Sequence, residues 1–132
     1  MDLDAPTILI VDNDEGMTAA LSFRLGSHGY HCITAASGAQ GIAACREQDV
    51  DLIITDLNMP AGDGVALAQT VRTFSQIPIV IVSGFHGDFR DRLNRIENVT
   101  VLPKPFDTSR LIDLIEADLI MSGVELPAAS IG

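Results

Sequence analysis

Four polar side chains with complementary chemistry follow separate apolar runs of the sequence. Asp12 and Asp56 close two of these runs, Ser83 follows a third and Lys104 a fourth. Two carboxylates brought about 5 Å apart would repel each other by roughly 3 kcal/mol at an effective dielectric of about 20. A hard divalent cation such as Mg²⁺ relieves that repulsion, because it prefers carboxylate, carbonyl and water oxygens as ligands. The acidic pair therefore predicts a site for Mg²⁺ or another divalent cation.

The hydroxyl and the ammonium extend this chemistry toward phosphoryl groups. Lys104 is the only lysine of the chain and lies between Pro103 and Pro105. An ammonium point charge suits one oxygen of a transferred phosphoryl group, and the small hydroxyl of Ser83 can bond another. Phosphoryl transfer needs an in-line nucleophile and neutralisation of three equatorial oxygens. Asp56, as the central carboxylate, is the nucleophile that this pattern predicts.

Short apolar runs recur along the chain and predict the strands that position these side chains. Between the runs, apolar residues recur at helical spacing, so strand and helix alternate five times. Runs almost free of polar residues suit strands buried on both faces. The predicted fold is α/β, a doubly wound five-stranded parallel sheet with helices on both faces, with ligands beyond the carboxyl ends of the strands. The predicted strands are Ile8–Val11, Tyr30–Ala35, Leu52–Ile54, Ile77–Val82 and Val99–Leu102.

Local signals predict where some of the helices begin and end. Ser37 and Gln40 have the spacing of a capping box, and Asp107 precedes the last helical stretch. Gly26 and Gly29 fall where the first helix should stop. The apolar positions at helical spacing are Met17, Leu21 and Leu25; Ile42 and Cys45; Leu67, Val71 and Phe74; Phe89, Leu93 and Ile96; and Leu111, Leu114, Ile115 and Leu119.

Length and composition limit the domain organisation. The 132 residues suffice for one ordinary domain, and a hydrophobic content of 47% is enough to bury a core. We expect one domain over residues 1–121, followed by a weakly patterned tail or truncated linker over residues 122–132. Cys32 and Cys45 have no metal-ligand spacing to the histidines, which predicts free buried thiols.

Charge and hydropathy exclude several classes of partner. A formal charge of -10 repels nucleic acid phosphates and anionic membrane surfaces, so neither is an expected direct partner. The apolar runs are far shorter than a membrane span, and the acidic start Met1–Asp4 is unlike a signal peptide. These features predict a cytoplasmic protein.

Four motifs in order resemble response regulator receiver domains of two-component signalling, the CheY-like superfamily. The resemblance runs from about Thr7 to Met121 and implies a flavodoxin-like receiver fold. The matching segments are Ile8–Asp12; Asp51–Pro60, with Gly64; Ile79–Gly84; and Lys104–Phe106.

This resemblance implies a phosphoacceptor domain, not an enzyme. Asp56 would accept a phosphoryl group from a phosphohistidine of a sensor histidine kinase or a histidine phosphotransfer protein. Mg²⁺ would be held by Asp12, Asp56 and the backbone carbonyl of Asn58. Ser83 would be the switch hydroxyl, and Lys104 would pair with a phosphoryl oxygen, with its bond to Pro105 in the cis form. The downstream partner stays unidentified.

The sequence departs from the family pattern at two positions. Asn13 stands where the family usually has a second acid, so its amide oxygen would be the metal ligand there, and the loss of a charge should weaken Mg²⁺ binding unless Asp14 compensates. Val101 stands in the switch region where many members carry an aromatic residue, so coupling between Ser83 and the output face would be absent or altered.

The resemblance also assigns expectations to residues around the site. Asn58 and Phe85 would tune the lifetime of the phosphoryl group by admitting or excluding water. Phe23 lies off the apolar stripe of its helix, on a face that the family often offers to its phosphodonor. The three histidines, by contrast, are expected to be structural or surface residues; they are His28, His31 and His86.

Two alternative functions remain open. Asp12-Asn13-Asp14 fits the Asp-x-Asp pattern of haloacid-dehalogenase-like phosphatases, with Asp88 and Asp91 as a loose further acidic pair, but this leaves the segment around Asp56 unexplained. The other alternative is a receiver-like binding module that acts without phosphorylation, a possibility raised by Asn13 and Val101.

Overall fold

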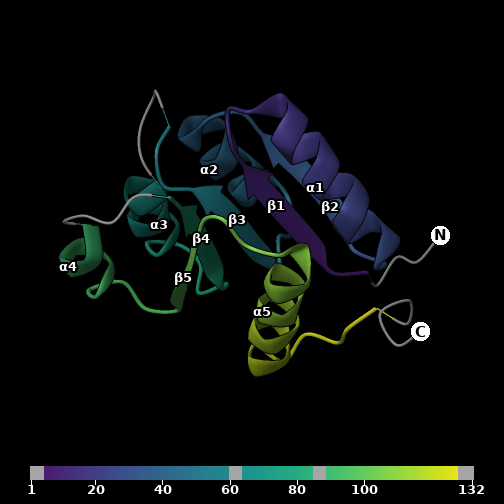
Figure 1. The fold of residues 1–132 in the computed structure, drawn as a ribbon. Helices are drawn as coiled ribbons and strands as arrows, with labels where there is room; N and C mark the ends of the chain where they lie inside the picture. The colour runs from purple at the N-terminus through teal and green to yellow at the C-terminus, as the bar shows by residue number, and fades with distance from the viewer. Residues whose placement is uncertain (1–4, 60–63, 85–88, 128–132) are drawn as a thin grey trace.

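The computed structural model describes residues 5–59, 64–84 and 89–127. Strands and helices alternate as predicted, and the five strands form one parallel sheet in the order β2-β1-β3-β4-β5 (Figure 1). The predicted fold class is therefore confirmed. The elements are β1 (Thr7–Val11), α1 (Glu15–Ser27), β2 (His31–Ala35), α2 (Gly38–Glu47), β3 (Leu52–Asp56), α3 (Gly64–Val71), β4 (Ile79–Ser83), α4 (Phe89–Leu93), β5 (Val99–Pro103) and α5 (Thr108–Met121).

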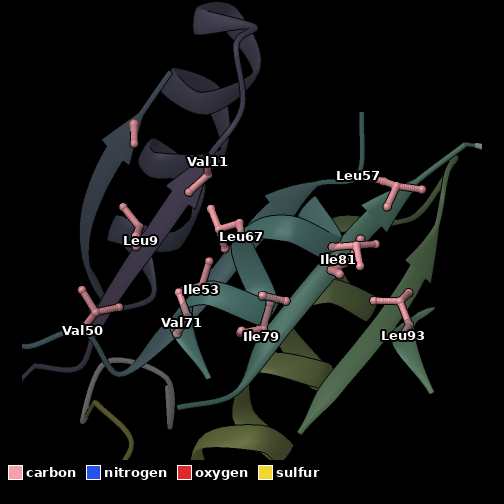
Figure 2. Close-up of a cluster of buried hydrophobic side chains, with 13 residues drawn as sticks. Leu9, Val11, Val50, Ile53, Leu57, Leu67, Val71, Ile79, Ile81 and Leu93 are labelled. Carbon is pink, nitrogen blue, oxygen red and sulfur yellow. The ribbon is translucent and has the colours of Figure 1, made fainter. Parts of the chain in front are cut away.

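The central strands β1, β3 and β4 are buried on both faces because successive side chains enter two different cores, whereas the edge strands β2 and β5 are partly exposed. On one face Leu9, Ile53 and Ile79 pack with residues of α2, α3 and α4, as Figure 2 shows in part. On the other face Ile8 and Ile54 pack with residues of α1 and α5. This alternation explains why the central strands read as continuous apolar runs in the sequence.

The helix-start signals act as the sequence predicts, with one exception. Ser37 accepts a hydrogen bond from the backbone N–H of Gln40, whose side chain in turn accepts one from the N–H of Ala36. Asp107 is the N-cap residue of α5 but its side chain makes no capping hydrogen bond. The first helix ends at Ser27, and Gly29 adopts a φ of 94°, a conformation that glycine tolerates without steric cost.

Four elements are shorter than their apolar patterns predict, of which β2 begins at His31, after Tyr30, and α4 ends at Leu93, before Ile96. The fourth strand begins at Ile79 and not at Ile77, because Pro78 has no N–H to donate to the sheet. The third helix ends at Val71, and the chain continues through Phe74 as a tighter turn in which the N–H of Phe74 donates to the carbonyl of Val71. Phe74 itself is 37% exposed and lies beneath the Arg46 guanidinium, outside both cores, although its spacing from Leu67 and Val71 looks helical in the sequence.

A single guanidinium ties together the loops at the amino-terminal end of the sheet. Arg72 donates hydrogen bonds to the backbone carbonyls of Ser75, Ile77, Glu97 and Asn98 at 2.7–3.0 Å. The side chain of Asn98, which has a φ of 58°, donates to the carbonyl of Gln76 at 3.0 Å. The α3–β4 and α4–β5 connections are thus fastened to each other.

The core beneath α1 and α5 extends into the segment that follows α5. Val124 and Leu126 pack against this core, and Pro127 is buried. Tyr30, which precedes β2, belongs to the same core and is 4% exposed. Burial, with a smaller contribution from Glu116, raises the pKa of its phenol to about 12.

The two cysteines are free thiols, half-buried in different parts of the fold. Burial raises the pKa of Cys32 to about 11 and also raises the pKa of Cys45. Both thiols therefore stay protonated at neutral pH. No helix in the described part of the chain is long and apolar enough to cross a membrane.

Candidate functional site

The four side chains singled out by the sequence lie at the carboxyl ends of four strands in one sheet. Asp56 is the last residue of β3 and Ser83 the last of β4, while Asp12 and Lys104 directly follow β1 and β5. The register pairs Val11 with Thr55, so Asp12 and Asp56 continue from neighbouring positions. The parallel sheet therefore brings two carboxylates, a hydroxyl and an ammonium to one edge.

Asp56 and Lys104 form an ion pair across this edge. The Lys104 Nζ lies 3.6 Å from the Asp56 Oδ1, and the two side chains are 31% and 16% exposed, respectively. The separation exceeds that of a short charge-assisted hydrogen bond. Asp56 is thus partly open to solvent and lies close to a cation that does not fully engage it.

Asp12 is the more buried of the two carboxylates, at 7% exposure. Its Oδ1 accepts a hydrogen bond from the backbone N–H of Asp14 at 3.0 Å. Asp14 in turn caps α1, its Oδ1 accepting from the N–H of Met17 at 3.1 Å. The Asp14 carboxylate is therefore committed to the helix terminus and does not turn toward Asp56, and Asn13 is exposed.

The donor set suits a hard cation but carries few charges. Within the described ranges, no cluster of three or more His, Cys, Asp or Glu side chains could hold a metal ion. The oxygens at the edge are the carboxylates of Asp12 and Asp56, with the backbone carbonyl of Asn58 two residues beyond β3. Oxygen donors of this kind fit Mg²⁺, which usually keeps several waters and needs only one or two carboxylates.

Ser83 is 2% exposed and lies between the phosphoacceptor candidate and β5. Its backbone carbonyl accepts a hydrogen bond from the N–H of Lys104 at 2.8 Å, which holds the ends of β4 and β5 together. The Lys104–Pro105 peptide bond is cis, as expected. Val101 lies on the edge strand β5, where it pairs with Ile81 of β4, and is 39% exposed.

Other residues named by the sequence lie away from this cluster or beyond what the structure describes. His31 is exposed and His28 half-buried, in keeping with structural or surface roles. The expectations for Phe85, His86 and Asp88 concern positions outside the described residues. Asp91 is exposed on α4.

Sequence patterns do not single out Thr55, which the structure places directly behind the site. Thr55 is completely buried, and its hydroxyl donates a hydrogen bond to the backbone carbonyl of Asp56 at 3.0 Å. The only sequence feature that points to Thr55 is a hydroxyl in an otherwise apolar strand, immediately before Asp56.

An apolar groove of about 940 Å³ adjoins the site. It runs between α1 and the loop from β5 to α5, and Lys104 lies at its border. Phe23, on the wall formed by α1, is 80% exposed. Phe106 and Pro105 line the opposite side.

Comparisons with known proteins identify the family. Residues 8–116 match the response regulator receiver domain. The chain is 35% identical over 118 residues to the transcriptional regulatory protein GlrR of Escherichia coli, covering 87% of this chain and 26% of the relative. It is 30% identical over 129 residues to the transcriptional regulatory protein PrrA of Mycobacterium tuberculosis, covering 96% of this chain and 55% of the relative.

Solved structures give the same result. The receiver domain of the hybrid histidine kinase CckA has a TM-score of 0.73 at 28% identity, covering 86% of this chain and 98% of that one. The chemotaxis response regulator CheY4 of Vibrio cholerae has a TM-score of 0.78 at 26% identity, with the same coverage of 86% and 98%. The chain spans about a quarter to a half of the length of the curated relatives named above. The fold, the order of the motifs and these matches together establish that the chain belongs to the response regulator receiver domain family.

Proposed function

We propose that this receiver domain accepts a phosphoryl group on Asp56 from a phosphohistidine of a sensor histidine kinase or a histidine phosphotransfer protein. The observation that carries the proposal is the partly exposed Asp56 carboxylate, 3.6 Å from the Lys104 ammonium at the edge that also holds Asp12 and Ser83. A carboxylate oxygen of Asp56 would form a bond to phosphorus as the phosphorus–nitrogen bond of the donor breaks. The imidazole leaves, and the product is an aspartyl phosphate.

Residues of this chain would hold Mg²⁺ through oxygen ligands only. These are the carboxylates of Asp12 and Asp56, the backbone carbonyl of Asn58 and, through water or its own amide, Asn13. When bound, the ion neutralises charge on the transferred group. Because Asp14 is held as the cap of α1, the residues that the structure describes offer two carboxylates and no third, and the affinity of the site for Mg²⁺ should be modest.

Lys104 and Ser83 would respond to phosphorylation of Asp56 by binding the phosphoryl group. The Lys104 ammonium, released from Asp56, pairs with one phosphoryl oxygen, and the Ser83 hydroxyl bonds another. Because Ser83 and Lys104 are joined through their backbones at the ends of β4 and β5, drawing them inward shifts the equilibrium of the surface formed by α4 and β5. Identical chemical shifts on that surface in the two states would contradict this switch.

The groove beside Lys104 is the proposed docking surface for the phosphodonor. Phe23 is 80% exposed at its α1 wall, and an aromatic side chain exposed to this degree beside an apolar groove favours contact with a partner. Docking there brings a donor's phosphohistidine next to the Asp56–Lys104 pair. The receiver itself is not expected to contact nucleic acid, although the relatives GlrR and PrrA are transcriptional regulatory proteins.

The phosphatase alternative requires Asp12 to be the nucleophile. Asp12 is 7% exposed and already accepts a hydrogen bond from the N–H of Asp14, whereas Asp56 is more exposed and is the carboxylate paired with Lys104. The geometry therefore favours Asp56. The binding-module alternative gains its only support from Asn13 and Val101.

Intact mass after incubation with acetyl phosphate, with and without Mg²⁺, tests the proposal. We expect a metal-dependent gain of one phosphoryl group that is absent in Asp56→Asn. Asp107→Asn is the matched control, because Asp107 is exposed beside the same edge and its side chain makes no capping hydrogen bond. No adduct and no phosphate release would favour the binding module. Phosphate release that survives Asp56→Asn but not Asp12→Asn would favour the phosphatase.

A further inference from the structure

The first residue of α3 makes an unusually close approach to the main chain at Asp56. Gly64 is buried, and a Cβ atom added to it would lie 2.6 Å from the backbone oxygen of Asp56 and 3.2 Å from the Cα of Leu57. Both atoms belong to the backbone, so they cannot rotate away as the end of a flexible side chain would. Any residue other than glycine must therefore move α3, the end of β3, or both.

The same stretch of main chain is held from two further directions. The Thr55 hydroxyl donates to the carbonyl of Asp56 at 3.0 Å, and the N–H of Leu57 donates to the carbonyl of Val82 on β4 at 3.1 Å. The N–H of Gly64 closes the arrangement by donating to the carbonyl of Leu57 at 2.8 Å. Strand β4, a buried hydroxyl and the start of α3 together fix the peptide that carries Asp56.

Gly41 provides a contrast within the same molecule. A Cβ atom added there would lie 2.9 Å from the Val11 Cγ2 and 3.2 Å from the Leu67 Cδ1, which are side-chain atoms. Those side chains can shift by a few tenths of an ångström without moving the backbone of β1, which bears Val11, or of α3, which bears Leu67. A substitution at Gly41 therefore disturbs packing, whereas one at Gly64 disturbs the position of the Asp56 backbone.

We propose that Gly64 is a positioning residue for phosphoryl transfer: its close approach to the Asp56 main chain, which leaves no room for a Cβ atom, sets where the Asp56 carboxylate lies relative to Lys104. The inference rests on the proposed function of Asp56 as phosphoacceptor. A small shift of the β3 end would alter both the Asp56–Lys104 separation of 3.6 Å and the direction of nucleophilic attack.

The test compares Gly64→Ala with the matched variant Gly41→Ala. The rate of phosphorylation is followed at saturating Mg²⁺ and acetyl phosphate, and stability by urea unfolding. We expect both variants to lose stability, Gly64→Ala to react at least tenfold more slowly than the wild type, and Gly41→Ala to stay within twofold of it. The ¹³C resonance of the Asp56 carboxyl should shift in Gly64→Ala while that of Asp107 does not.

Several outcomes would overturn the inference. A folded Gly64→Ala that reacts at the wild-type rate would overturn it. Equal slowing in Gly64→Ala and Gly41→Ala would also overturn it, because that result points to general destabilisation. A wild type that takes no phosphoryl group would overturn the proposed function and this inference with it, so the wild-type control separates the two failures.

A second pair of variants covers the case in which Gly64→Ala does not fold. Thr55→Val removes the hydroxyl that holds the Asp56 carbonyl but keeps the shape of the side chain, whereas Thr55→Ser keeps the hydroxyl. We expect Thr55→Val to react several-fold more slowly than Thr55→Ser. Equal rates in these two variants would show that the position of the Asp56 main chain does not limit the reaction.

Discussion

The two ends of the parallel sheet are held together in different ways. At the amino-terminal end, Arg72 donates hydrogen bonds to four carbonyl oxygens at 2.7–3.0 Å, and the N–H of Thr7 donates to the Asp51 carboxylate at 2.7 Å. At the carboxyl end, Asp56 and Lys104 form an ion pair at 3.6 Å. At the first end, four of the five N–H donors of Arg72 are used by backbone carbonyls, whereas the charged groups at the second end are incompletely paired and can still bind a ligand.

This difference separates stability from function within one small domain. Charged donors that are fully used by backbone acceptors stabilise a fold but have nothing left for a ligand. Carboxylates and an ammonium that are incompletely paired contribute little to stability but can bind a cation or a phosphoryl group. We therefore expect substitutions at the two ends to affect different measurements.

The largest effect should come from Arg72→Ala. Its loss leaves several carbonyl oxygens without their charged donor, which should lower the free energy of unfolding by about 3 kcal/mol. Arg46→Ala is the matched control, because Arg46 is exposed and lies over the Phe74 ring at 4.4 Å, and it should cost well under 1 kcal/mol. Urea unfolding measures both. Wild-type stability of Arg72→Ala would show that the hydrogen bonds of Arg72 do not stabilise this end of the sheet.

High pH should lower the free energy of unfolding because it ionises Tyr30, which lies at the amino-terminal end of the sheet. The phenol has a pKa of about 12 in the folded chain and near 10.0 when unfolded, so the unfolded chain loses its proton first as the pH rises. Stability from this group is complete below pH 10 and should fall by about 1.4 kcal/mol per pH unit toward pH 12. Cys32, with a pKa of about 11, adds a similar loss that begins near pH 9.

Urea unfolding at a series of alkaline pH values checks this dependence. Tyr30→Phe keeps the ring and removes the titrating group, so its decline between pH 10 and 12 should be shallower than that of the wild type. Equal slopes in the two proteins would mean that Tyr30 ionises at its ordinary pKa in the folded state.

At the carboxyl end, Asn13→Asp should strengthen Mg²⁺ binding. Asn13 is exposed beside Asp12, and Asp14 is held as a helix cap, so the substitution supplies a third carboxylate. We expect Mg²⁺ affinity to rise about tenfold, or about 1.4 kcal/mol. Isothermal titration calorimetry measures it. Asn94→Asp adds the same charge at an exposed position directly after α4. An equal gain in Mg²⁺ affinity there would mean that the effect comes from net charge alone.

The smallest effect on stability should come from Lys104→Met. Its ion pair with Asp56 is partly exposed and at 3.6 Å, so its removal should change the free energy of unfolding by less than about 1 kcal/mol. Urea unfolding of Lys104→Met and Arg72→Ala under the same conditions tests directly whether the two ends of the sheet contribute differently to stability. Similar losses in the two variants would mean that both ends stabilise the fold alike.

The sequence could predict the fold and the location of the site because both follow from patterns of residue type. Buried strands appear as apolar runs, and residues that end parallel strands must meet at one edge, as Asp56 and Ser83 do. The end of α3 was harder to place, because a tight turn through Phe74 keeps the apolar spacing of a helix.

The contacts that fix the geometry could not be predicted in the same way. The acceptors of Arg72 are backbone carbonyls, which every residue possesses, so no sequence pattern marks them. The sequence left open whether Asp14 faces the metal or caps α1, since aspartate suits both, and the direction of its carboxylate is settled only by the structure. The approach of Gly64 to Asp56 depends on how α3 packs against β3.

Tyr30 also determines what optical methods can detect in this protein. The chain has one tyrosine and no tryptophan, and that tyrosine is buried in the core beneath α1 and α5, just before β2 begins at the amino-terminal end of the sheet. Its emission should therefore report unfolding of this core and respond weakly to events at Asp56. A fluorescence assay of phosphorylation will need an introduced tryptophan near the carboxyl end of the sheet, where no native fluorophore competes with it.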